Sequence, residues 1–290
     1  MASRIIYYFI IIPISILPYP LLYLLSDGIF LILFKLIGYR KKVVSLNLRN
    51  SFPSKSNDEL ELIMRSFYRH LCDLIVESIK GFTIDDKNLK ERLIIRNSTL
   101  LNQFYDKNQG VILVGGHVNN WEICAQAVPF YSLHKCVGIY KPLKNNFFNT
   151  KLKKSRTKYG LVLCPMSDTR NLFDEKKPLK AIIFGSDQSP SNPNNAYWMN
   201  FLNQETGVLF GAEKYAKEYN YPVVYVRVFK VKRGFYEVEY ELIEENPKQT
   251  SYGQITESFT KMIEKDILLN PQYWLWSHRR WKHKKPQSAN

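Results

Sequence analysis

His117 and Glu122 are the side chains whose types and spacing first suggest chemistry. They follow the apolar residues 111–114 and the pair Gly115-Gly116, and glycines tolerate unusual backbone angles and close approach of a ligand. We expect a buried strand at 111–114 that leads to His117, and then a helix whose first turn carries Glu122. A neutral imidazole can remove a proton from a hydroxyl while a carboxylate fixes its tautomer. A purely structural hydrogen bond is the alternative interpretation.

Two further sites carry charged side chains beside expected elements. Residues 181–187 repeat the order of strand, glycine and polar residue, and they end on Asp187. Residues 151–158 contain five cations, among them Arg156. A guanidinium in such a cluster can hold a phosphate or carboxylate, although a basic run is more often a solvated helix face. Asp187 can position Arg156 or a substrate, or it can cap a loop.

The elements that must position these residues alternate between strands and helices. Beyond residues 111–114, we expect strands at 135–140, 181–184, 223–229 and 235–243, the last as an antiparallel edge strand. Helices are expected near 60–79, 121–128, 211–219 and 252–268. This order predicts an α/β fold with a mixed central sheet flanked by helices.

The charge balance favours anionic partners. The chain of 290 residues has 41 Lys and Arg against 26 Asp and Glu, which gives a formal net charge of +15. Nucleic acid, anionic lipid and an acidic carrier protein all fit that charge. The four cysteines show no spacing typical of a metal site, so we expect reduced thiols in a domain that faces the cytosol.

The N-terminal segment favours a lipid partner. Between residues 5 and 34 the only charged side chain is Asp27, although prolines at 13, 18 and 20 interrupt the apolar run. Residues 21–37 approach the roughly 20 residues that span a bilayer, and the basic residues 40–42 follow. We expect residues 1–42 to be a membrane anchor that spans the bilayer or lies in one leaflet. A buried helical hairpin is the alternative.

Four blocks stand in order along the chain: His117 to Glu122, Tyr140-Lys141-Pro142 with Arg156, Asp187 to Pro190, and residues 273–282 with Trp276-Ser277-His278-Arg279-Arg280. Together they resemble the lipid A secondary (late) acyltransferases, which share a His-x4-Asp/Glu motif with the lysophospholipid acyltransferases. Two features depart from that family's pattern: Lys141 stands where the family has Arg, and Ser189-Pro190 stand where it has a Gly before Pro.

The resemblance implies a glycerophosphate acyltransferase-like αβα domain over residues 43–290. It implies transfer of a fatty acyl chain from acyl carrier protein to a hydroxyl of a lipid A precursor at the cytoplasmic side of the inner membrane. His117 would be the general base and Glu122 would orient it, with no metal and no cofactor besides the acyl carrier protein. The expected substrate-binding residues are Lys141, Arg156, Asp187, His278, Arg279 and Arg280. For the last three, a structural role is the alternative to binding the anionic headgroup.

Three rival functions stay open from the sequence. An acyltransferase for an amino-acid lipid or a lysophospholipid would keep His117 and Glu122. A silent protein that binds the membrane surface would not need them. A nucleic-acid binder would use the positive charge, but the chain has no recognition motif of that kind, so we expect no nucleic-acid partner.

Overall fold

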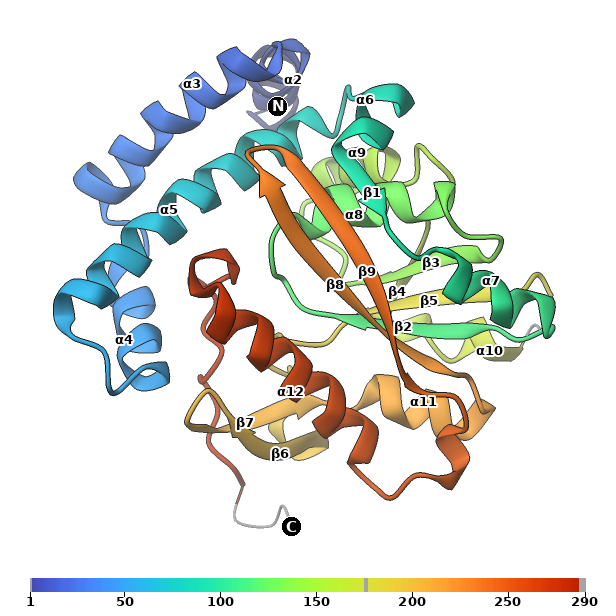
Figure 1. Cartoon of the computed structure of the whole chain (residues 1–290). Helices are drawn as coiled ribbons and strands as arrows, with labels where there is room; N and C mark the ends of the chain where they lie inside the picture. The colour runs from blue at the N-terminus through green and yellow to red at the C-terminus, as the bar shows by residue number, and fades with distance from the viewer. Residues whose placement is uncertain (1, 175–176, 287–290) are drawn as a thin grey trace.

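A seven-stranded mixed sheet lies at the centre of the molecule (Figure 1). The computed structural model describes residues 2–174 and 177–286. The strand order is β1-β9-β8-β2-β5-β3-β4, and all neighbouring pairs are parallel except β8 with β9. The strands are β1 (Leu93–Ile95), β2 (Val111–Gly115), β3 (Lys135–Tyr140), β4 (Val162–Pro165), β5 (Lys180–Gly185), β8 (Val223–Lys232) and β9 (Phe235–Glu244). The predicted mixed sheet is confirmed.

One prediction about the sheet is wrong. β9 is antiparallel to β8 as expected, but it is not the edge strand, because β1 pairs with its other side. β1 has only three residues, too few to show an alternating pattern. β4 and the separate hairpin of β6 (Ala196–Phe201) and β7 (Gln204–Leu209) were likewise not predicted.

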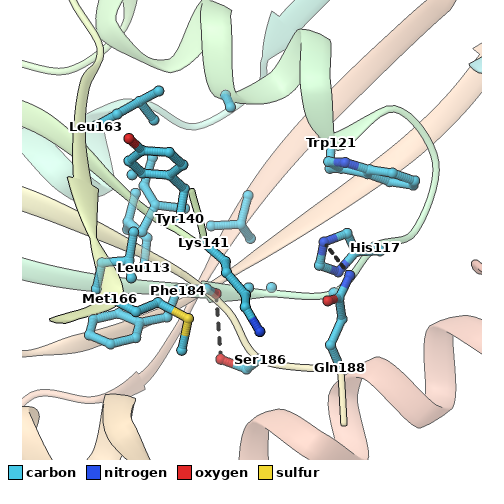
Figure 2. A pocket seen from close by; sticks show the side chains of 18 of the residues that line it. Leu113, His117, Trp121, Tyr140, Lys141, Leu163, Met166, Phe184, Ser186 and Gln188 are labelled. Atoms are coloured by element: carbon cyan, nitrogen blue, oxygen red, sulfur yellow. Dashed lines mark hydrogen bonds between the residues drawn. The ribbon is translucent and has the colours of Figure 1, made fainter. Parts of the chain in front are cut away.

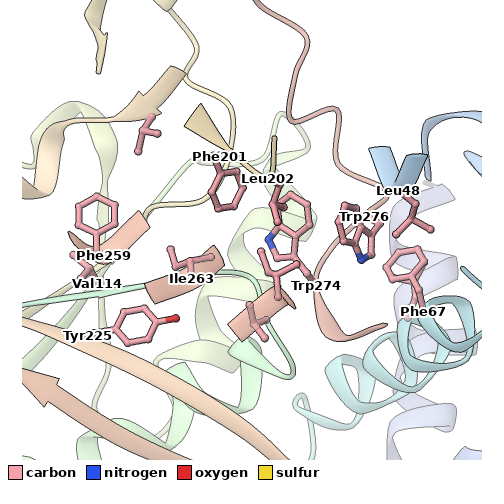
Figure 3. Close-up of a cluster of buried hydrophobic side chains, with 14 of the residues drawn as sticks. Leu48, Phe67, Val114, Phe201, Leu202, Tyr225, Phe259, Ile263, Trp274 and Trp276 are labelled. Atoms are coloured by element: carbon pink, nitrogen blue, oxygen red, sulfur yellow. The ribbon is translucent and has the colours of Figure 1, made fainter. Parts of the chain in front are cut away.

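Helices cover both faces of the sheet. Every residue of β2 from Val111 to Val114 is fully buried, and alternate side chains enter two different cores, as expected for a parallel strand covered on both sides. The core that contains Ile112 and Val114 also contains Trp274 and Trp276, which Figure 3 shows. The helices of this domain are α4 (Lys41–Ser51), α5 (Asn57–Lys80), α6 (Asp86–Arg92), α7 (Thr99–Asp106), α8 (Trp121–Ala127), α9 (Asn146–Arg156), α10 (Asn171–Asp174), α11 (Gly211–Tyr219) and α12 (Gln254–Leu269).

The N-terminal segment forms two apolar helices beside α5 (Figure 1). The first runs through α1 (Ala2–Ile6), the π-helical η1 (Tyr7–Ile11) and α2 (Ile12–Ile16). The second runs through α3 (Tyr19–Phe30) and the π-helical η2 (Leu31–Ile37), and by length and composition it can cross a membrane. Most of it is exposed, so it is not the core of a buried hairpin. The four cysteines are free and buried.

Candidate active site

His117 and Asp187 come together because the strands before them are parallel neighbours. β2 and β5 pair in register, and the last pair is Gly115 with Gly185. Each polar side chain follows its glycine by two residues. Both side chains therefore emerge at the carboxyl edge of the sheet, where α/β proteins commonly bind ligands.

The imidazole of His117 is held by the Asp187 carboxylate. His117 Nδ1 lies 2.6 Å from Asp187 Oδ1, and the backbone N–H of His117 donates to Oδ2 at 2.7 Å. The indole Nε1 of Trp274 donates to the same Oδ2 at 2.8 Å. With its proton on Nδ1, a neutral His117 has an unprotonated Nε2 whose lone pair can accept a proton, as a general base requires.

The electrostatics of this pair favour a charged Asp187 and a basic His117. Burial alone would lower the pKa of His117, but the Asp187 carboxylate and its hydrogen bond outweigh burial, so the pKa of His117 is raised. Burial would raise the pKa of Asp187, but the nearby His117 and the donors around the carboxylate hold that pKa at about 2. Asp187 is thus ionised at any pH at which His117 can act.

Two side chains surround the reactive face of the ring. The Gln188 side-chain amide lies 3.1 Å from His117 Nε2 and donates to it when the imidazole is neutral (Figure 2). The ring of Trp121 packs edge-on against the imidazole, with ring centroids 4.9 Å apart. A ligand that bonds to Nε2 would have to displace Gln188.

Glu122 does not orient His117, contrary to the sequence-based expectation. It forms a two-point ion pair with Arg156, whose Nε donates to Oε2 at 2.8 Å and whose Nη2 donates to Oε1. Asn120 caps α8, so Glu122 lies in its first turn and meets the last turn of α9. The acid five residues after His117 thus holds an arginine, and the acid 70 residues away holds the imidazole.

A mostly apolar cavity of about 530 Å³ opens beside His117, and Figure 2 shows some of the side chains that line it. His117, Glu122, Arg156 and Lys141 all line it. Asp187 does not line it in the described part of the chain, because it is buried behind the imidazole. The predicted role of Asp187 as a substrate contact is therefore replaced by contact with His117.

The terminal block of cations lies behind the site rather than in this cavity. His278 Nε2 accepts a hydrogen bond of 3.0 Å from the backbone N–H of Ser189, and burial lowers the pKa of His278 to about 4. Arg280 is buried and donates to the Gly207 carbonyl at 2.8 Å, and burial lowers its pKa to about 10. Arg279 is exposed. The contacts of His278 and Arg280 are those of structural residues, whereas substrate binding by His278, Arg279 and Arg280 stays a prediction.

Comparisons with known proteins cover nearly the whole chain. The family described as bacterial lipid A biosynthesis acyltransferase matches residues 2–283. The chain belongs to that family. It is 23% identical to a lipid A biosynthesis palmitoleoyltransferase of Escherichia coli over 269 residues, which cover 92% of this chain and 86% of the relative. A lipid A biosynthesis lauroyltransferase of the same organism is 20% identical over 270 residues, 92% of this chain and 87% of the relative.

Membership of the lipid A acyltransferase family supports acyl transfer in lipid A biosynthesis. Sequence reasoning found His117, Arg156, Lys141 and Asp187, but it assigned no role to Gln188 or Trp274. Gln188 follows Asp187 directly, so its place at the strand exit could have been predicted. Nothing in the sequence indicates that the Trp274 indole donates to Asp187, since 87 residues separate them.

Proposed function

We propose that this protein transfers a fatty acyl chain from acyl carrier protein to a hydroxyl of a lipid A precursor, with His117 as the general base. One observation carries the proposal: His117 lines an apolar cavity, while its Nδ1 is fixed by the ionised, buried Asp187. A site of this kind combines a proton acceptor with space for a lipid chain. Membership of the family supplies the reaction class.

The proposed reaction needs no covalent intermediate on the protein. His117 Nε2 removes the proton of the acceptor hydroxyl as the oxygen attacks the thioester carbonyl. The tetrahedral intermediate expels the thiolate of the carrier, and the imidazolium Nε2–H protonates that sulfur. Asp187 stabilises the imidazolium between the two steps. The Gln188 amide, released from Nε2 by the hydroxyl, is our candidate donor to the carbonyl oxygen as charge develops on it.

The charged side chains at the cavity support an anionic acceptor. Arg156 is already bound by Glu122, so a phosphate there would have to share the guanidinium. Lys141 has no ion-pair partner among residues 2–174 and 177–286, and it lines the same cavity. We assign Lys141 the first contact with the acceptor's phosphate, with Arg156 as the second.

The proposed place of action is the cytoplasmic face of the inner membrane. The apolar helix Tyr19–Ile37 supports membrane attachment, and Arg40, Lys41 and Lys42 follow it at the level where anionic headgroups would lie. The net charge of +15 also suits an acidic carrier protein as donor.

The test is mass spectrometry of a lipid A precursor incubated with acyl-charged carrier protein and purified full-length protein. Wild type should add one acyl mass, and His117→Ala should lose roughly 10²- to 10⁴-fold in rate, the usual contribution of a general base. Transfer to an amino-acid lipid or lysophospholipid, with none to the lipid A precursor, would reject the proposed acceptor. Full activity of His117→Ala would reject the proposed base.

A further inference from the structure

The cavity beside His117 has two apolar arms, because its lining comes from both faces of the sheet. On the face toward α8, Leu113, Ile183, Gly138 and Leu163 line it from four neighbouring strands. We call this part the α8 arm. On the opposite face, Phe184, Met166, Gly211 and Tyr215 line a second part, which we call the α11 arm. Successive side chains of a strand point to opposite faces of the sheet, so Ile183 and Phe184 of β5 belong to different arms.

The residues of the α8 arm form one continuous row across the sheet. Leu113 pairs with Ile183, Ile183 with Gly138, and Gly138 with Leu163. Three strand spacings of about 4.8 Å make this row roughly 14 Å long. It begins on β2, the strand that leads to His117, and it ends on β4.

The α8 arm reaches His117 at one end, and buried side chains bound it below and around Gly138. Between the row and His117 lie Gly115 and Gly185, and a Cβ added to Gly185 would come within 3.2 Å of the His117 ring. The next row in the other direction, Val111, Ala181 and Cys136, is fully buried and closes the floor. Leu161 and Val128, each 2% exposed, also line the cavity, and the side-chain end of Leu161 lies 3.7 Å from a Cβ built on Gly138, in the far half of the arm. The α11 arm is not closed in this way, since Met166 is 49% exposed.

Gly138 is the glycine of this row, and its backbone conformation does not require a glycine. Its backbone has no left-handed φ, and glycine is unfavourable inside a strand unless a ligand or another backbone approaches closely. The nearest atoms to a Cβ built there are the side-chain ends of Leu163 at 3.3 Å and Leu161 at 3.7 Å. A side chain at Gly138 would therefore be tolerated by the fold but would occupy the far half of the arm.

We infer that the α8 arm holds the acyl tail of the donor and that Gly138 sets the longest tail that it accepts. The inference rests on the proposed function. A blind apolar arm that starts at the general base suits a linear chain whose thioester stays at His117 and whose methyl end has nowhere to leave. Such an arm discriminates chain length, because methylenes that do not fit must stay in water.

The experiment compares Gly138→Ala and Gly138→Val with Gly211→Val in acyl transfer from carrier proteins charged with chains of increasing length. Gly211 is a matched control, because it lines the α11 arm and an added Cβ would meet only Phe184, at 3.7 Å. The Gly138 variants should move the optimum to shorter chains, further for Val than for Ala. The chain that wild type prefers should lose about four-fold in kcat/KM for each displaced methylene, which corresponds to about 0.8 kcal/mol.

Gly211→Val should keep the wild-type optimum. An active Gly138→Val with an unchanged optimum would overturn the inference, and so would a shift caused by Gly211→Val instead. Gly138→Ala carries the same test if the valine variant does not fold. Absence of product from wild type with every donor would instead overturn the proposed function and the inference with it, so the two failures are distinguishable.

Discussion

At the scale of single residues, the carboxylate that holds His117 belongs to Asp187, which is 70 residues away in the sequence. Asp187 raises the pKa of His117 against the effect of burial. A general base must be neutral, so activity should fall as the pH falls through this raised pKa. In Asp187→Asn the charge is gone and burial remains, so the acid limb of the kcat/KM profile should move to lower pH. The rate at the optimum should fall by about 10²- to 10⁴-fold, since the tautomer is no longer fixed.

The control for this experiment is His117→Ala, measured over the same pH range. It should show a residual rate without the acid limb. An Asp187→Asn protein whose acid limb stays at the wild-type pH would show that Asp187 does not act through His117.

Glu122 should behave differently from Asp187, because its ion-pair partner is Arg156. Glu122→Gln should shift the acid limb much less than Asp187→Asn does. In a double-mutant cycle with Arg156→Gln, the double variant should be little less stable than either single one, with a coupling of about 1–3 kcal/mol in the free energy of unfolding. Independent, additive losses would contradict the ion pair.

The prediction that Glu122 orients His117 is wrong because closeness along the chain did not mean contact in the fold. Proximity along the chain suggested the acid five residues from His117, but Glu122 sits inside α8 and its side chain meets α9. Asp187 occupied the same position after its own strand, and parallel neighbours bring such positions together. What the sequence did not contain was the strand order that makes β2 and β5 neighbours.

At the scale of elements, the start of α8 is fixed by a buried polar network. Asn120 Oδ1 accepts from the Ile123 N–H at 3.0 Å, and its amide donates to Glu77 Oε2 at 2.6 Å. Glu77 also accepts hydrogen bonds from Tyr23 of α3 and Tyr236 of β9. The helix that carries Glu122 is therefore tied to both the apolar N-terminal segment and the sheet.

This network predicts unequal costs for two similar N-caps. Asn145 caps α9 with the same side-chain contact, to the Phe148 N–H at 3.1 Å, but it is exposed. Asn145→Ala should cost about 1 kcal/mol in the free energy of unfolding. Asn120→Ala should cost about 3 kcal/mol, because a buried carboxylate also loses a donor. Urea unfolding in detergent, followed by circular dichroism, measures both, and equal losses would contradict the role given to Glu77.

Helices and strands were predictable from the sequence where their hydrophobic pattern extended over many residues. The helix at 211–219 was predicted with its observed bounds, and the helix near 60–79 extends to Asn57–Lys80 with a Ser56–Glu59 capping box. β6 and β7 mix polar and aromatic residues on a small sheet that is partly exposed, so no alternation indicated them. A short strand such as β1 forms because it pairs with β9, which is far away in the sequence, and the local residue pattern does not indicate such a pairing.

At the scale of the whole molecule, the second apolar helix has two unlike faces. One face contacts the protein: Ser26 donates to Asp73 at 2.8 Å, and Arg233 from the β8–β9 turn bonds Asp27 at 2.7 Å. The other face exposes large apolar side chains, including Leu24 and Leu36. Asp27 lies near the middle of Tyr19–Ile37, so a spanning helix would carry the β8–β9 turn close to the centre of a hydrocarbon layer about 30 Å thick. The helix should therefore lie along one leaflet.

Depth measurements test this orientation. A fluorophore on Leu21→Cys or Leu36→Cys should be quenched equally by lipids labelled at one depth, because both side chains lie on the exposed face. In a spanning helix the two positions would differ by about 22 Å along the axis. The native cysteines are buried and should not react, and Tyr252→Cys, exposed on the globular domain, is the unquenched control. Unequal depths would show a spanning helix.

The contacts of Trp274 and its neighbours have a consequence for the order of events during synthesis. The Asn119 N–H donates to the Tyr273 carbonyl at 2.9 Å, Trp274 bonds Asp187, and His278 holds the Ser189 N–H. Tyr273, Trp274 and His278 are synthesised long after β2 and β5, which they support. The apolar N-terminal helices leave the ribosome before both strands. We expect the nascent chain to reach the bilayer before its imidazole is fully supported. Acyl transfer would then begin only after translation has passed His278, on a chain already at the lipid surface.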